Sequence, residues 1–195
     1  MRAQRLEAFT DGVLAIVITI AVLEMKPPAS VQPAALIASL PVLLAYSLSF
    51  INVGIFWANH HHLLQATEKV DGRVLWANLS LLFWLSLVPF VIRWVDDQGI
   101  SPLPTAAYGF TLLMASISYV LTERAIIAAN DETPLLKEAV GNDTKGLVSL
   151  LLYAGGTCVA FLVPLAAVVA YLAVSVIWLV PDRRIEKRLT LRNKR

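Results

Sequence analysis

Long apolar stretches separated by short polar segments dominate the chain. A membrane-spanning helix needs about 20 mainly apolar residues. Four stretches meet this length, and a fifth contains 34 residues without a charged side chain. Two short helices that turn near Pro164 account for the fifth better than one very long tilted helix, which remains the alternative. The predicted spans are residues 6–25, 33–60, 72–95, 104–127, 147–163 and 165–180.

The basic residues predict how these spans are oriented. With a cytoplasmic N-terminus and six spans, 14 Lys and Arg residues lie inside, and only Lys26 and Arg93 lie outside. Loops rich in Lys and Arg stay in the cytoplasm, so this difference favours six spans over five. We therefore predict an all-α polytopic membrane protein of the cell membrane, with six transmembrane helices and both termini cytoplasmic. Residues 1–181 would form the membrane domain, and residues 182–195 a basic tail facing lipid headgroups.

Composition supports the membrane class and argues against several functions. Hydrophobic residues make up 57% of the chain and charged residues 15%, with a mean hydropathy of +0.68. A soluble domain carries about 25% charged residues. No glycine-rich phosphate loop, CxxC pair or HExxH motif is present. We expect no enzymatic activity, no cofactor and no nucleic-acid partner.

The first span, FTDGVLAIVITIAVLE at residues 9–24, is strongly apolar, with Asp11 near its start and Thr19 in its middle. At about 100° per residue, Ile16 lies on a bulky aliphatic face, and Thr19 flanks that face about 60° from Ile16. Asp11 lies about 140° from Ile16 and so points away from the face. A carboxylate at membrane depth usually faces the protein interior, although a helix start at the membrane interface is the alternative. The members of the aliphatic face are Phe9, Gly12, Val13, Ile16, Ile20 and Leu23.

Possible partners for Asp11 lie at the end of the second span and the start of the third. Trp57, His60 and Asn78 carry an indole, an imidazole and an amide that could hydrogen-bond to a carboxylate. The run His60–His62 invites a metal interpretation, but consecutive helical residues diverge by about 100° and share a tetrahedral site poorly. No metal is expected. A proton relay between Asp11 and a histidine stays open.

The segment RLEAFTDGVLAIVITIAVLE, residues 5–24, resembles the first-helix signature of the transmembrane protein 175 family. Arg5, Phe9 and Asp11 match that signature, and Thr10 replaces its serine while keeping the hydroxyl. Trp57 and His60 of the second span, and the segment WLVPDRRIE at residues 178–186, are also similar to its bacterial branch. The family comprises potassium-permeable channels of bacteria, archaea and animal endolysosomes.

The resemblance implies a homotetramer in the bilayer, with a pore lined by the first helix of each subunit and potassium as the permeant ion. It implies that Ile16, Ile20 and Leu23 form the pore constriction and that Thr19 forms the selectivity layer. The TVGYG filter of ordinary potassium channels is absent. By the same resemblance, a motif of four residues would hold the pore helix in place, and the three possible partners of Asp11 named above are further candidates for its support. The motif is Arg5, Phe9, Thr10 and Asp11, and the supporting residues are Trp57, His60 and Asn78.

A potassium-selective, passive leak channel is therefore the expected function. One alternative is a proton-permeable or proton-coupled transporter that uses Asp11 and a histidine. Another is a membrane subunit that transports nothing.

Overall fold

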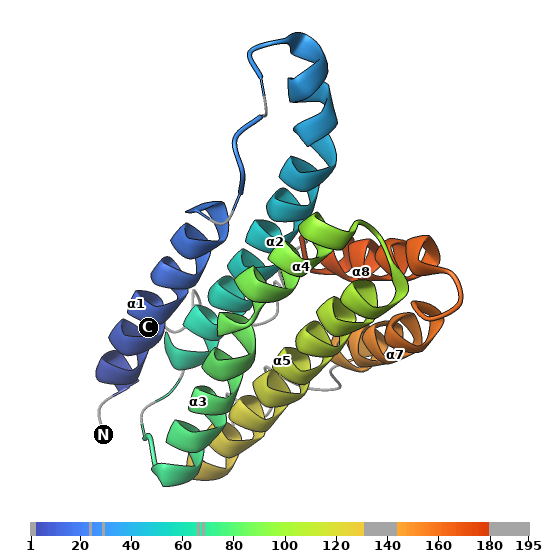
Figure 1. Cartoon of the computed structure of the whole chain (residues 1–195). Helices are drawn as coiled ribbons and strands as arrows, with labels where there is room; N and C mark the ends of the chain where they lie inside the picture. The colour runs from blue at the N-terminus through green and yellow to red at the C-terminus, as the bar shows by residue number, and fades with distance from the viewer. Residues whose placement is uncertain are drawn as a thin grey trace.

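The computed structural model describes residues 3–23, 25–28, 30–65, 67, 69–130 and 144–179 (Figure 1). The predicted basic tail, residues 182–195, lies outside this part. All regular elements in the described part are helices, in agreement with the all-α prediction. The helices are α1 (Ala3–Leu23), α2 (Pro33–Gln65), α3 (Gly72–Ser86), α4 (Val88–Gln98), α5 (Pro102–Ala129), α7 (Thr144–Val159) and α8 (Pro164–Leu179).

Four helical segments of the described chain are long and apolar enough to cross a membrane. The other two apolar helices, α7 and α8, have 16 residues each. At 1.5 Å per residue each is about 24 Å long, which is shorter than a hydrocarbon core of about 30 Å. Six full spans per chain therefore remain a prediction. The four long segments are Ala3–Leu23, Val42–Gln65, Gly72–Gln98 and Pro102–Ala129.

The third predicted span consists of two helices rather than one. α3 ends at Ser86 and α4 begins at Val88, with Leu87 as a single turn residue between them. Pro89 occupies the first turn of α4, where its missing N–H costs nothing. Together α3 and α4 still form one apolar segment of 27 residues.

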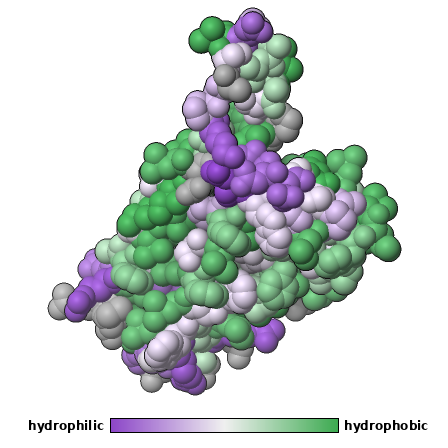
Figure 2. All heavy atoms as spheres, viewed as in Figure 1, coloured by the Kyte–Doolittle hydropathy of each residue, from purple (hydrophilic) through white to green (hydrophobic). Residues whose placement is uncertain are grey.

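The helices form one bundle, whose two ends we name after the two ends of α1. We call the end that holds Ala3 the inner end and the end that holds Leu23 the outer end. At the outer end, Lys26 Nζ lies 3.0 Å from Asp97 Oδ1. α1 packs on α2, α3 and α4, whereas α7 and α8 pack on the far side of α5 (Figure 1). Apolar side chains cover most of the surface seen in Figure 2, as a lipid-facing surface requires.

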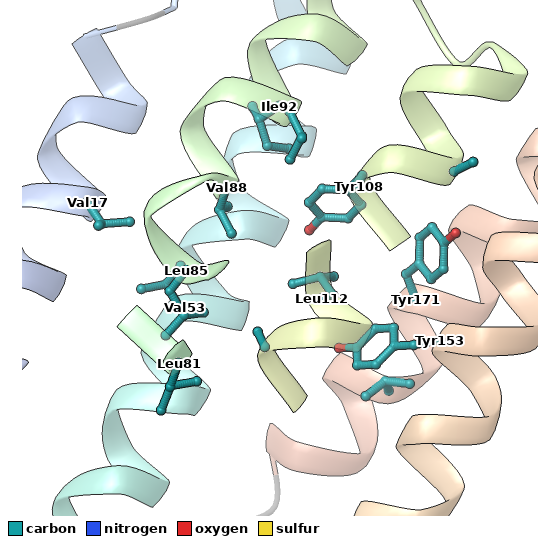
Figure 3. Packing of buried hydrophobic residues seen from close by; sticks show 14 of the residues in the cluster. Val17, Val53, Leu81, Leu85, Val88, Ile92, Tyr108, Leu112, Tyr153 and Tyr171 are labelled. Atoms are coloured by element: carbon teal, nitrogen blue, oxygen red, sulfur yellow. The ribbon is translucent and has the colours of Figure 1, made fainter. Parts of the chain in front are cut away.

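The main core runs along α5, which packs on α3 and α4 on one side and on α7 and α8 on the other (Figure 3). The buried ring of Tyr171 occupies a slot between α5 and α7 that two glycines leave open. A Cβ atom added at Gly109 would lie 1.9 Å from the Tyr171 hydroxyl, and one at Gly156 would lie 2.6 Å from its ring. Small residues of this kind allow membrane helices to approach closely.

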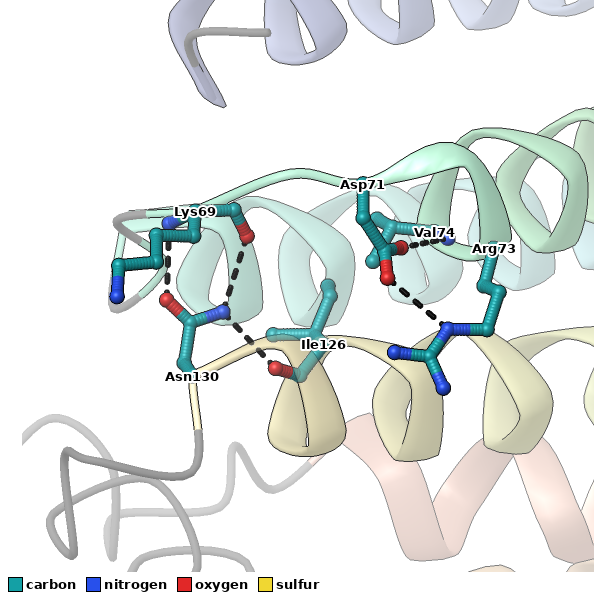
Figure 4. Close-up of polar contacts among 6 residues, drawn as sticks. All are labelled: Lys69, Asp71, Arg73, Val74, Ile126 and Asn130. Carbon is teal, nitrogen blue, oxygen red and sulfur yellow. Dashed lines mark hydrogen bonds and ion pairs between the residues drawn. The ribbon is translucent and has the colours of Figure 1, made fainter.

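Polar side chains close the inner end (Figure 4). Asn130, at the end of α5, accepts a hydrogen bond from Lys69 N at 2.8 Å and donates to Lys69 O at 3.0 Å. Asp71 caps α3 by accepting from Val74 N at 3.0 Å, and Arg73 Nε lies 2.9 Å from its other oxygen. The Val74 N–H and then Arg73 hold the pKa of the Asp71 carboxyl below its ordinary value.

Candidate pore helix and its polar contacts

Helix α1 has one face covered by its own chain and one left uncovered. Leu6, Thr10, Leu14, Val17 and Ala21 are buried, at the spacing of three and four residues that forms one helical face. The uncovered face carries the bulky residues of the predicted constriction. Ile16 is 59% exposed and Leu23 is 80% exposed, and Ile20 and Phe9 are also exposed.

Thr19 lies beside this uncovered face with its hydroxyl turned back to the helix. Its Oγ1 lies 3.0 Å from Ala15 O and 2.9 Å from Ile16 O, both of which can accept its proton. A threonine bonded in this way offers an oxygen acceptor rather than a hydrogen donor to its surroundings. The side chain could therefore meet a cation, but the arrangement itself does not test selectivity.

The carboxylates of α1 face α2 on the other side. Trp57 Nε1 donates to Asp11 Oδ1 at 2.8 Å. One turn nearer the inner end, His61 Nδ1 lies 2.8 Å from Glu7 Oε1. The Trp57 and His61 rings stack with centroids 5.8 Å apart, so the two contacts form one continuous column.

A second polar contact joins α1 to both α2 and α3. Asn78 is fully buried, with 0% of its surface exposed. His60 Nε2 lies 2.6 Å from Asn78 Oδ1, and Asn78 Nδ2 donates to Thr10 Oγ1 at 3.1 Å. If the imidazole donates to the amide oxygen, His60 is protonated on Nε2 and each polar group has a partner.

The candidate support residues therefore divide into two separate contacts. Asp11 pairs with Trp57, whereas His60 bonds to Asn78 rather than to Asp11. Arg5 is exposed in the first turns of α1, away from the buried face.

Sequence reasoning missed Glu7 and Gln65, and it named His61 only within the run His60–His62 without assigning it a contact. Gln65 Nε2 lies 2.8 Å from His61 Nε2 and completes the column on α2. The spacing of these residues could have indicated the contacts. Residues four positions apart lie on the same face of a helix, and this spacing separates Glu7 from Asp11 on α1 and Trp57, His61 and Gln65 on α2. Among the described residues, no group of three or more His, Cys, Asp or Glu side chains could hold a metal ion.

Comparison with known proteins identifies the family. The profile described as endosomal/lysosomal potassium channel TMEM175 matches residues 5–89. A potassium channel of Chryseobacterium sp. (strain P1-3), HX13_20290, is 49% identical over 189 residues, which cover 97% of this chain and 98% of that protein. The chain belongs to the TMEM175 family.

Two further relatives place the chain within the TMEM175 family. The crystal structure of a lysosomal potassium-selective channel TMEM175 homolog from Chamaesiphon minutus has a TM-score of 0.73 at 25% identity, covering 92% of this chain and 97% of that one. The human endosomal/lysosomal proton channel TMEM175 is 39% identical over 93 residues, but the match covers only 18% of its length. The chain is thus a membrane protein of a potassium-channel family, and its relatives are channels rather than enzymes.

Proposed function

We propose that this TMEM175-family chain forms a passive, potassium-selective channel with a pore lined by α1 of each subunit. The uncovered aliphatic face of α1, opposite the polar contacts that hold the helix, is the observation that supports this most. One helix cannot enclose an ion path, whereas a closed symmetric ring of four copies can. A homotetramer in the cell membrane, with both termini cytoplasmic, would bring the four uncovered faces together.

The exposed side chains give each part of α1 a role in this proposal. Ile16, Ile20 and Leu23 recur at four and three residues, so rings of them would form a constriction about 10 Å long. An aliphatic constriction of this kind can gate by losing its water. Thr19 would supply oxygen ligands beside it and form the selectivity layer.

The remaining motif residues would hold the pore helix in position. Thr10 and Asp11 make interhelical contacts through Asn78 and Trp57, and His60 supports Asn78. Arg5 and Phe9 are exposed on α1 and would meet a neighbouring subunit or the membrane interface. In this arrangement the carboxylate of Asp11 supports the helix and does not bind the permeating ion.

Potassium flux into liposomes that contain the purified protein tests the proposal. Ile16→Asn should wet the constriction, raise the flux and lower the preference for potassium over sodium. Leu151→Asn, at an exposed position on α7, makes the same substitution away from α1 and should change neither quantity. Unchanged flux and ion preference in Ile16→Asn would show that α1 does not line the pore.

The same liposomes discriminate the proton alternative, which the name of the human relative keeps relevant. Under that alternative, current would follow the proton gradient and remain when potassium is replaced. A potassium channel instead gives a reversal potential that moves with the potassium gradient.

A further inference from the structure

α2 is longer than α1, and the polar contacts between the two helices show at which end α2 extends past α1. Glu7 faces His61 and Asp11 faces Trp57. The two helices are antiparallel, so a step of four residues forward on α1 corresponds to a step of four residues back on α2. Continued to the outer end, this antiparallel register places Leu23, the last residue of α1, level with Ala45. Residues 33–44 of α2, which we call the outer arm, therefore extend about 18 Å past the end of α1. Figure 1 shows this arm projecting beyond the other helices.

Charged side chains lie close to the base of the outer arm. Lys26, three residues after the end of α1, and Arg93 on α4 both contact Asp97, at 3.0 Å and 3.1 Å. Such groups belong at or beyond the membrane interface. Figure 2 shows hydrophilic side chains gathered below the arm. The arm thus continues outward from a polar boundary.

Helix α2 is too long to lie entirely within the hydrocarbon core of a membrane. With 33 residues, α2 is about 50 Å long, against a hydrocarbon core of about 30 Å. The helix would have to tilt by more than about 50° to fit inside the core, whereas spanning helices tilt by 0–40°. Part of α2 must therefore leave the hydrocarbon, and the charges of Lys26, Arg93 and Asp97 near the base of the outer arm indicate that the arm does so.

The outer arm nevertheless has a strongly apolar surface. Five large aliphatic side chains lie within about 120° of arc on one face, and all five are exposed. The opposite face carries alanines, and Ser39 is the only polar residue of the arm. A helix that rests on a membrane surface has a polar face rich in Lys or Arg, which this arm lacks. The five aliphatic residues are Leu36, Ile37, Leu40, Leu43 and Leu44.

We propose that the aliphatic face of the outer arm packs against a neighbouring copy of this chain. The inference rests on the proposed function, because a ring of pore helices places copies of the chain side by side. The arm carries no charge, so its partner surface must also be apolar, and an identical arm or the apolar surface of the next subunit provides one. The spacing of four and three residues is the spacing by which helices interdigitate. The contact holds the ring together outside the constriction, beyond the level of Leu23.

Two charge variants with matched spacing test the contact. Leu36→Glu/Leu40→Glu places two carboxylates on the aliphatic face, and Ala34→Glu/Ala38→Glu places the same pair on the opposite face. We expect the first variant to dissociate into smaller species at concentrations at least about tenfold higher than the wild type, because an apolar contact does not tolerate unpaired charges. The second variant should assemble like the wild type. The measurements are light scattering in mild detergent and subunit counting by photobleaching in liposomes, with circular dichroism to verify that each variant is folded.

Cysteine crosslinking gives a readout that does not depend on weakening the assembly. In a Cys158→Ser background, Leu40→Cys should form a disulfide between subunits, and Ala38→Cys should not. Absence of the Leu40→Cys crosslink, equal assembly of both charge variants, or equal loss of assembly in both would overturn the proposed contact. Potassium flux separates this inference from the proposed function. A Leu36→Glu/Leu40→Glu protein that stays assembled and conducts refutes only the arm contact, whereas an assembled wild type without potassium flux refutes only the channel function.

Discussion

Replacing Asn78 with leucine is the most direct test of how α1 is held. Leucine has a similar size, so the main change is the loss of the bonds to His60 and Thr10. Each buried polar group left without a partner costs about 1–3 kcal/mol. Interhelical hydrogen bonds in membrane proteins average about 0.6 kcal/mol and reach about 1.7. With two bonds at a residue that is 0% exposed, we expect Asn78→Leu to lower the free energy of unfolding by about 2–3 kcal/mol.

Reversible unfolding in mixed micelles, followed by tryptophan fluorescence and circular dichroism, measures this loss. Asn59→Leu is the matched control, because within the described residues the Asn59 amide donates to Ile55 O of its own helix, and we expect a clearly smaller change. A double-mutant cycle with Thr10→Val should show that the two losses are not additive. An Asn78→Leu protein within about 0.5 kcal/mol of the wild type, or strict additivity in the cycle, would refute the reasoning.

Two further predictions concern the scaffold. Gly109→Ala should destabilise the protein by about 1–3 kcal/mol, because the added Cβ would overlap Tyr171. In the control Gly54→Ala the added Cβ meets nothing within 4 Å, so we expect no loss of stability. Equal unfolding midpoints for the two variants would contradict this prediction. The bond from Val74 N lowers the pKa of Asp71, so its stabilising contribution is complete above the ordinary pKa of 3.8 and is lost as the pH falls through the lower value in the folded protein. Asp71→Asn should therefore weaken the acid-side decrease in stability, and parallel pH–stability curves for variant and wild type would exclude this role.

The sequence pattern was sufficient for the membrane class and for the two sides of α1. The 100° periodicity separated Ile16 and Ile20 from Asp11, and the structure leaves the isoleucines exposed while Asp11 contacts Trp57. These inferences depend only on local helix geometry and on the cost of a carboxylate at membrane depth. The family itself followed from a motif of a few residues in the same helix.

Features that depend on how helices align could not be obtained in this way. The outer arm reads as part of an ordinary span, because hydropathy does not report where a neighbouring helix ends. The break at Leu87 had no signal beyond the nearby Pro89. Within the described residues, His61 pairs with Glu7, and no histidine pairs with Asp11, because of the register between α1 and α2. The sequence of either helix taken by itself does not specify that register.

That register would set the height of the proposed constriction in the membrane. Apolar contacts discriminate weakly between registers in lipid, where the surrounding tails are as apolar as leucine. A slip of four residues, about 6 Å, would even preserve one carboxylate contact, since Glu7 would then replace Asp11 beside Trp57. The same slip would bring Leu6 to the place of Thr10 and leave the Asn78 Nδ2 group without the Thr10 hydroxyl that accepts its hydrogen bond.

The contact of Thr10 with Asn78 is therefore what makes the register unique. A slip in the opposite direction fails for the same reason, because Leu14 would then face the buried amide. An amide buried among apolar side chains penalises both alternatives, which is how a single polar residue specifies register in other helical assemblies. If the rings of Ile16 and Ile20 form the constriction, their alignment in every subunit depends on a hydroxyl that points away from the pore.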